Sequence, residues 1–419
     1  MNGIQALTED LSLYIHWPFC LSKCPYCDFN SHVINDIDQF VWREGLLTEM
    51  KTLAKNTEDR KLKSVFFGGG TPSLMEPQIV SDIISEAKKI WRVDDLLEIS
   101  LEANPSSVEA KRLHLFNQAG INRISLGVQS FNDTTLKFLG REHDAADSKR
   151  ALEIAKKTFE NVSFDMIYAT PEQTLQDWAS EIRQAIEFSS NHISVYQLTI
   201  ERGTAFFQKH RKGEFEMLDG ETLADLYELT QDKLGSAGLA GYEISNHAVP
   251  SFECVHNLQY WKMKDYLGIG AGAHSRLTDK EGVRWAFRTH RAPNKWLSET
   301  KAYGHAVAEK VCLSLEEQIF ETLMMGLRLK KGISTANFKN TFKKGVEEIF
   351  TGETLEILLN ERLIEIDNES FKATSVGRQK LDSLIRFLFS DFDLDLHSCL
   401  LYTSPSPRDR YISRMPSSA

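Results

Sequence analysis

The 419-residue chain has no long uninterrupted hydrophobic segment, although 42% of its residues are hydrophobic. A membrane-spanning helix needs about 20 consecutive, mostly apolar residues. The sequence therefore predicts no transmembrane segment and leaves peripheral association with a membrane open. A hydrophobic leader is missing too, since the first ten residues are mixed in character and end in Glu9-Asp10. We therefore expect a cytoplasmic protein.

The chain also has few cysteines and no excess of basic residues. Six cysteines without an export signal favour a reducing compartment over a disulfide framework. The 59 acidic residues outnumber the 49 basic ones, which gives a net charge of -10. Nucleic-acid-binding proteins carry a basic footprint instead. We therefore expect no nucleic-acid partner.

Three of the cysteines lie close together as C-x3-C-x2-C, at Cys20, Cys24 and Cys27. Clustered thiolates are the preferred ligands of iron–sulfur clusters. Three of them can bind three irons of a cubane cluster and leave the fourth iron open to a reactive ligand. A structural zinc site is the alternative, but it normally needs four protein ligands. No second close pair follows, so Cys254 or His256 would have to complete such a site.

Strand-like and helix-like segments alternate over the first 200 residues, the pattern of a parallel α/β sheet. The predicted strands are 12–17, 64–67, 97–103, 123–129, 162–168 and 193–198. The predicted helices between them include 40–54, 78–91, 108–119 and 145–159. About six β/α units, in place of eight, predict an open, partial TIM-like barrel.

Polar and apolar side chains alternate along these strands. In strand 123–129, the apolar Ile124, Leu126 and Val128 alternate with small or polar residues, and the neighbouring strands repeat the pattern. Helices would cover the apolar faces, so the polar faces should line the inside of the barrel. A sealed barrel core would be apolar. We therefore expect the interior to be a pocket.

The regular alternation ends near residue 200. A helix is predicted at 221–234, a loop-rich stretch at 241–276 and another helix at 315–327. A hairpin pattern follows at 363–373, and together with its neighbouring helices it resembles a winged-helix module. Such modules often bind DNA, but the acidic surroundings favour packing or contact with a protein partner. The predicted division is a partial barrel with the cysteine loop (1–200), a loop-rich extension (201–310), a winged-helix-like α+β domain (311–396) and a tail (397–419). The Ser-Pro-rich tail has no apolar face, so we expect it to be disordered, and its sequence leaves open that it is not native.

The cysteine run resembles the radical S-adenosylmethionine (SAM) superfamily, because it follows a predicted strand and has an aromatic residue, Tyr26, before the third cysteine. The stretch 13–20 narrows the resemblance to the group that holds the oxygen-independent coproporphyrinogen III oxidases and the HemW-type haem chaperones. The string Gly-Ile-Asn-Arg-Ile-Ser-Leu-Gly-Val-Gln-Ser-Phe at 120–131 is a specific match to this group. The resemblance implies a [4Fe–4S] cluster on the three cysteines, with SAM bound to the open iron and cleaved by one electron. It covers residues 11 to 390, with a local departure at Ala169, where relatives often have glycine.

The resemblance also implies which residues contact SAM. A run of three glycines before Thr71 ends the second predicted strand, where glycine lets a ligand or a backbone come close. Polar residues at the ends of other strands complement the ammonium, carboxylate, ribose and adenine of SAM, although each alone also fits a solvated or structural role. The residues expected to contact SAM are Tyr14, Gly70, Thr71, Pro72, Glu102, Gln129, Arg141 and Asp165.

Two positions distinguish members of the group. Coproporphyrinogen oxidases carry a fourth cysteine two residues after the third, and this chain has Phe29 there. The chain also contains His-Asn-Leu-Gln-Tyr-Trp, which resembles the haem-binding signature of the chaperones. We expect His256, Asn257, Tyr260 and Trp261 to bind haem, through an imidazole or phenol ligand and an indole on the porphyrin face. The alternative is a structural loop packed against the barrel mouth.

These observations favour a haem chaperone that binds haem, a [4Fe–4S] cluster and SAM and passes haem to an acceptor protein. An electron donor for the cluster would be a further partner. The alternatives are a coproporphyrinogen III oxidase and a protein with a purely structural cluster. The sequence assigns no catalytic residue and leaves open whether the chain is an enzyme.

Overall fold

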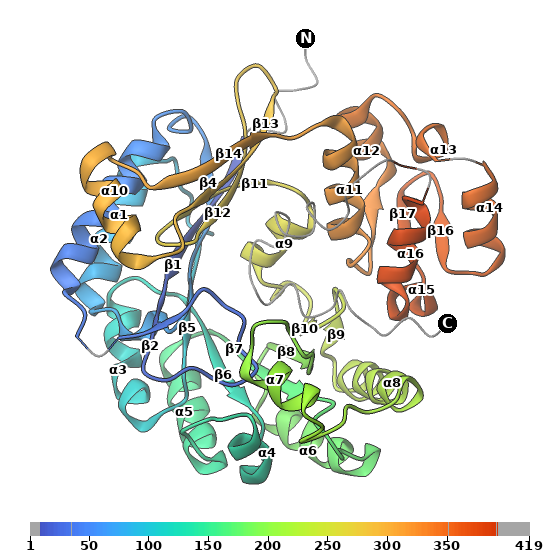
Figure 1. Ribbon diagram of the computed structural model, residues 1–419, viewed down its shortest axis with the longest axis horizontal. Helices are drawn as coiled ribbons and strands as arrows, with labels where there is room; N and C mark the ends of the chain where they lie inside the picture. Colours follow the sequence, from blue (N-terminus) through green and yellow to red (C-terminus); the bar gives the residue numbers. More distant parts are fainter. Residues whose placement is uncertain (1–8, 35, 351, 391, 393–419) are drawn as a thin grey trace.

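Twelve strands form one mixed sheet in the structure, which is a computed structural model (Figure 1). The structure describes residues 9–34, 36–350, 352–390 and 392, so the predicted tail, 397–419, lies outside the described residues. The sheet has the order β14-β13-β12-β11-β1-β4-β5-β6-β7-β8-β10-β9. Its two ends are therefore built from strands that come late in the chain.

The centre of the sheet is parallel, as predicted. Its strands are β1 (Asp10–Trp17), β4 (Lys61–Gly69), β5 (Glu98–Ala103), β6 (Arg123–Gln129), β7 (Asn161–Tyr168) and β8 (His192–Gln197). Each pairs in parallel with the next in this order. The helices that connect them include α1 (Gln39–Ala54), α2 (Pro77–Ile90), α3 (Ser107–Gln118), α5 (Ala145–Thr158) and α6 (Leu175–Phe188). These helices cover the outer face of the sheet (Figure 1), which confirms the open, partial TIM-like barrel.

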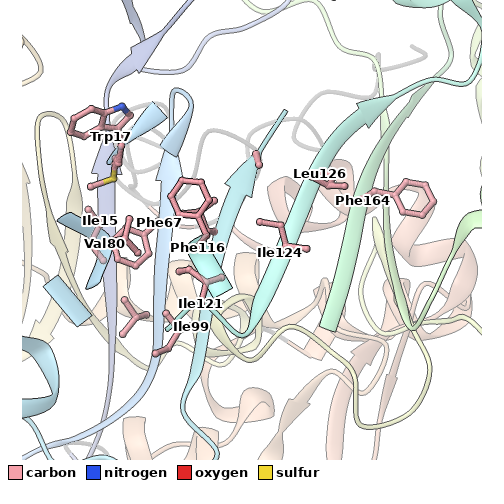
Figure 2. Close-up of a cluster of buried hydrophobic side chains, with 14 of the residues drawn as sticks. Ile15, Trp17, Phe67, Val80, Ile99, Phe116, Ile121, Ile124, Leu126 and Phe164 are labelled. Atoms are coloured by element: carbon pink, nitrogen blue, oxygen red, sulfur yellow. The ribbon is translucent and has the colours of Figure 1, made fainter. Parts of the chain in front are cut away.

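Apolar side chains from the strands and the covering helices share one core. Figure 2 shows Ile15 and Phe67 from the strands in the same cluster as Val80 of α2 and Phe116 of α3. The apolar residues of β6 that were predicted to face the helices belong to this cluster as well. The opposite face of the strands is left for polar side chains.

The region expected to be loop-rich contains regular structure instead. Its elements are β9 (Ala240–Gly241), β10 (Asn246–Ala248), α9 (Val255–Trp261), β11 (Asp265–Ile269) and β12 (His274–Thr278). β11 adds to β1 in parallel, and β10 adds to β8 in antiparallel orientation. The expectation was wrong because strands of two to five residues carry too little periodicity to be identified. Pairing with the edges of the sheet decides their structure.

A smaller domain follows at the C-terminal end, beginning with α11 (Leu315–Gly326). Its other elements are β15 (Ile333–Ser334), α12 (Thr335–Phe342), α13 (Val346–Ile349), α14 (Gly352–Asn360), β16 (Ile364–Ile366), β17 (Ser370–Ala373), α15 (Ser375–Gln379) and α16 (Leu381–Leu388). β16 and β17 pair in antiparallel orientation, which confirms the predicted hairpin at 363–373. The helices around a three-stranded sheet agree with the winged-helix-like α+β prediction.

The smaller domain is tied to the large sheet by a buried ion pair. Arg276 of β12 and Glu321 of α11 approach to 2.9 Å.

The remaining elements are β2 (Phe19–Cys20), β3 (His32–Val33), η1 (Pro72–Leu74), α4 (Asp133–Phe138), α7 (Ala205–Arg211), α8 (Gly220–Ser236), β13 (Arg284–Thr289), α10 (Pro293–Tyr303) and β14 (Val307–Cys312). Within the described part of the chain, no helix has the length and apolar character to cross a membrane.

Candidate cofactor site

A cavity of about 1280 Å³ opens at the carboxyl ends of the parallel strands. Parallel strands place the residues that follow them at one edge of the sheet, so side chains distant in sequence meet there. The predicted cluster ligands that line the cavity are Cys20, Cys24 and Cys27. The predicted SAM residues that line it are Gly70, Thr71, Pro72, Glu102, Gln129, Arg141 and Asp165. Tyr14 is not among its lining residues.

The glycine run brings the end of β4 against the start of the cysteine loop. The backbone N–H of Gly70 donates to the carbonyl of Trp17 at 2.7 Å, and the N–H of Thr71 donates to that of Phe19 at 2.7 Å. A Cβ on Gly70 would lie 2.6 Å from the Phe19 carbonyl oxygen. The hydroxyl of Thr71 then reaches the sulfur of Cys20 at 3.4 Å. Glycine is therefore required here for a close backbone approach that positions the first thiol.

Arg141 joins the cysteine loop to the opposite wall. Its guanidinium donates to the sulfur of Cys24 at 3.3 Å and to the side-chain oxygen of Asn104, after β5, at 2.6 Å. The preceding Gly140 has φ of 67°, and a Cβ there would lie 2.5 Å from the ring of Pro25. The left-handed turn and the missing side chain allow this close contact. A positive charge is thus held beside the thiols.

Burial has the largest effect on the pKa of two of the thiols. It raises the pKa of Cys20, and it raises the pKa of Cys27 to about 11. Arg141 and the hydroxyl of Thr71 lower the pKa of Cys20 by less than burial raises it. Thiols with such pKa values are protonated at neutral pH, so formation of a metal–thiolate bond must release protons.

Cys20, Cys24 and Cys27 all line the same cavity. Among the described residues, no three His, Cys, Asp or Glu side chains converge as they would on a single metal ion. A cubane cluster takes its thiolates at separate corners, so three cysteines around one open cavity can hold such a cluster.

Backbone strain marks the polar wall. Gln129, the last residue of β6, has φ of 68°, and the pairing of β6 with β7 is irregular between Leu126 and Gln129. A Cβ on Gly127 would lie 3.0 Å from the amide nitrogen of Gln129. Strain of this kind is often concentrated at functional sites. It turns the Gln129 side chain into the cavity, where the buried Asp165 accepts a hydrogen bond from Ser125 at 3.4 Å.

A second, smaller cavity of about 530 Å³ lies deeper in the barrel and has Glu102 and Tyr196 in common with the first. Its lining confirms the predicted polar interior. Four serines, from β5, β6, β7 and β8, face it, at Ser100, Ser125, Ser163 and Ser194. Tyr14 lines this inner cavity and stacks at 6.2 Å on the imidazole of His256.

Helix α9 closes the inner cavity. Its N-terminus is capped by Glu98 of β5, whose carboxylate accepts the backbone N–H groups of Val255 at 3.1 Å and His256 at 3.0 Å. The imidazole of His256 is hydrogen-bonded at both nitrogens, to Ser64 at 2.8 Å and Tyr260 at 2.7 Å. Burial lowers the pKa of His256 to about 3, so the ring is neutral.

The residues predicted to bind haem do not share one surface. Asn257 and Tyr260 line the inner cavity with His256, whereas Trp261 is absent from its lining. The Trp261 ring faces the C-terminal domain, where the guanidinium of Arg328 lies 4.4 Å from its centre. The four residues therefore divide between two sides of one short helix.

Sequence reasoning missed several residues of the main cavity, among them Asn104, Glu109 and Tyr196. Glu109 of α3 accepts hydrogen bonds from the Ser73 hydroxyl and from the backbone N–H of Asn104 at 2.9 Å. Asn104 and Tyr196 lie at the carboxyl ends of β5 and β8. Position at a strand end was the signal that could have found these two, whereas the Ser106-x-x-Glu109 pattern marks Glu109 only as part of a helix start.

The chain matches known proteins along most of its length. The model of the radical SAM superfamily matches residues 14–185, and that of the HemN C-terminal domain matches 313–379. "Heme chaperone HemW" of Haemophilus influenzae is 36% identical over 387 residues, covering 91% of this chain and 98% of that protein. "Radical S-adenosyl methionine domain-containing protein 1, mitochondrial" of Bos taurus is 35% identical over 390 residues, covering 91% and 88%.

A solved structure supports the same fold. Coproporphyrinogen III oxidase (HemN) from Escherichia coli superposes with a TM-score of 0.75 at 22% identity, over 94% of this chain and 92% of that one. Its identity is low enough that it shows the fold alone. The HemW of Escherichia coli is 33% identical over 383 residues, covering 91% of this chain and 98% of that protein. The chain therefore belongs to the radical SAM superfamily and, within it, to the HemW family.

Proposed function

We propose that this protein is a haem chaperone that binds a [4Fe–4S] cluster, SAM and haem and passes the haem to an acceptor protein. The similarity to proteins named heme chaperone HemW over nearly their whole length supports this. The observation that carries the choice of a chaperone over an oxidase is Phe29. Its side chain lines the cofactor cavity at the position where the oxidases have a fourth cysteine.

The cysteine loop would hold the cluster. Cys20, Cys24 and Cys27 are its ligands, and the hydrogen bonds from Thr71 and Arg141 to two of the sulfurs stabilise the negative charge that thiolates carry. When bound, the cluster supplies one electron to SAM. The predicted SAM residues line the same open cavity as the three cysteines, so SAM would bind beside the cluster.

The polar wall would orient SAM. Glu102 and Asp165 are acceptors for its ammonium and ribose groups, and Arg141 is a donor for its carboxylate. Burial of Asp165 makes each such contact stronger than it would be in water. Tyr14, one layer deeper, would act on this site through the shared wall of the inner cavity.

Haem would bind at the segment of α9. An electron donor and a haem acceptor would be the protein partners.

We propose the cytoplasm as the location, because a reducing compartment preserves free thiols. The mitochondrion is the alternative, since the names of several animal relatives place them there.

The alternative function is an oxygen-independent coproporphyrinogen III oxidase, an enzyme that has the same fold. Anaerobic reconstitution separates the two. The protein, with SAM and a reductant, is divided between a haem titration followed by absorption and an assay for conversion of coproporphyrinogen III. We expect bound haem and no vinyl product. Vinyl product from the wild-type protein, absent from the Cys24→Ala variant, would overturn the chaperone proposal.

A further inference from the structure

A large cavity lies away from the cysteines, between the end of α9 and the smaller C-terminal domain. Its open space is about 2430 Å³, larger than the 1280 Å³ of the cofactor cavity. Figure 1 shows α9 between the large sheet and α11, and the two helices are in contact. We call this cavity the α9 groove. That space includes the part open to solvent at the mouth, and a site of ordinary small-molecule size, roughly 300–1,000 Å³, fits within it, so the groove can take a large flat ligand.

The floor of the α9 groove is apolar and aromatic. Leu258 and Trp261 contribute from α9, and Phe338 and Phe342 contribute from α12. Trp261 is 2% exposed, and its indole N–H has no hydrogen-bond partner among the described residues. These aromatic side chains are almost fully buried, so they give the groove a rigid, apolar base. The floor therefore suits a flat, apolar macrocycle.

The rim of the α9 groove is basic, although the chain as a whole has a net charge of -10. The lysines in its lining are Lys262, Lys264, Lys330, Lys331 and Lys343. Arg284 also lines it but is paired with Asp265 at 3.0 Å. In the described chain, Glu253 is the one carboxylate among the lining residues. The groove thus concentrates positive charge.

The lysines are close enough to repel one another. Partial burial lowers the pKa of Lys262, and the charges of Lys331 and Lys264 lower it further. Lys262 comes from the end of α9, whereas Lys331 comes from the turn after α11, so the two segments meet across the groove. An anion between them would relieve this repulsion.

We infer that the α9 groove is the site where the protein carries haem, with the macrocycle on the apolar floor and the two propionates at the lysine rim. The inference rests on the proposed function and names the site for it. A flat apolar ring with two carboxylates complements an apolar floor with a basic rim in both shape and charge.

The inner cavity is a poorer site for haem. It has about 530 Å³ of open space, and both nitrogens of His256 are already hydrogen-bonded within it. The cofactor cavity is taken by the proposed cluster and SAM. The α9 groove leaves both undisturbed and lies at a boundary between domains, where a haem acceptor can reach the ligand.

The test uses the reconstituted full-length protein and two ligands, haemin and its dimethyl ester, which lacks free carboxylates. The variant Lys262→Gln/Lys331→Gln removes two charges from the rim, and Lys111→Gln/Lys157→Gln removes two exposed lysines from α3 and α5 as a control. We expect the rim variant to bind haemin roughly tenfold more weakly than wild type, and the control to bind normally. With the ester, all three proteins should bind alike. Cluster absorption in each verifies folding.

The outcomes separate the inference from the proposed function. Equal haemin affinity in wild type and rim variant would overturn the α9 groove as the haem site while leaving a haem chaperone in place. An equal loss of haemin and ester would overturn recognition of the carboxylates. Haem lost in His256→Gln but retained in the rim variant would move the ligand to the inner cavity. Failure of the wild-type protein to bind haemin would sink the proposed function itself.

Discussion

The cofactor cavity and the α9 groove are built on opposite principles. The first collects residues from the ends of successive parallel strands, so positions as far apart as Cys20 and Asp165 meet in one place. The second lies where one short helix faces another domain, and its character comes from an apolar floor and a lysine rim. One is polar and sulfur-rich; the other is apolar with charge at its edge. The fold therefore offers separate chemistry in the cofactor cavity and in the α9 groove.

Helix α9 is the wall between the inner cavity and the α9 groove. His256 and Tyr260 are four residues apart and face the inner cavity together, as helical spacing requires. Trp261, the next residue, faces the α9 groove. Six residues that read as one motif therefore serve two surfaces.

The largest expected effect is loss of the cluster. Replacing Cys20, Cys24 or Cys27 with alanine should abolish iron–sulfur absorption after reconstitution, because each sulfur is one of three cluster ligands. The exposed Cys312 lies on β14 and is the control. Absorption that survives in Cys24→Ala, or disappears in Cys312→Ala, would contradict the assignment of the cofactor cavity.

The next effect tests the close approach behind the cysteine loop. Gly70→Ala would place a Cβ 2.6 Å from the carbonyl oxygen of Phe19. We expect about 1–3 kcal/mol of lost stability and a lower cluster content, because the backbone must shift. Gly220→Ala, at the start of α8, meets no atom within 4 Å and is the control. Denaturant unfolding and iron content measure both; equal behaviour would show that the loop is not held by this contact.

An effect of similar size is expected for the binding of SAM. Arg141→Ala removes a guanidinium bonded to Cys24 and Asn104, and SAM should bind more weakly by about 1–3 kcal/mol. The electron paramagnetic resonance signal of the reduced cluster, titrated with SAM, gives the affinity. Arg150→Ala removes an exposed arginine from α5 and should leave it unchanged. A signal indifferent to SAM in the wild-type protein would favour a structural cluster.

The smallest effect concerns His256 on helix α9. The pKa of His256 is lowered to about 3 in the folded protein from an ordinary value of 6.5, so the unfolded chain binds the extra proton between these pH values. Stability should therefore fall as the pH drops below 6.5, by at most about 1.4 kcal/mol per pH unit from this group. Unfolding at several pH values should show a shallower slope in His256→Gln and an unchanged slope in His114→Gln, an exposed control. An unchanged slope in both would show that His256 is not held neutral.

Much of the cofactor cavity could be predicted from the sequence, because it depends on local signals. Period-two alternation identified the strands, and parallel strands bring their ends together. Depth along a strand was harder to predict. Tyr14 lies three residues before the end of β1, at the level of Phe66 and Gly268, and so lines the inner cavity. Ala169, where relatives often have glycine, adopts φ of 60°, a conformation that explains the glycine.

The α9 groove could not be predicted, because it depends on contacts between distant segments. The lysines of its rim come from α9, the turn after α11 and the end of α12, and none forms a run that reads as a site. The direction of α9 is set by Glu98, which caps it from a strand more than 150 residues earlier, as the Glu98–Val255 bond spans 157 residues. The motif predicted a haem segment but not which side of the helix faces which cavity.

The most direct test of this account is a haemin titration of the cluster-free Cys20→Ala/Cys24→Ala/Cys27→Ala protein beside the wild type. If the cofactor cavity and the α9 groove are separate sites, the variant should bind haemin within about twofold of the wild-type affinity, because its apolar floor and lysine rim are intact. The Lys262→Gln/Lys331→Gln change should weaken both proteins alike. Haemin binding that disappears with the cluster would contradict the account and place haem in the cofactor cavity.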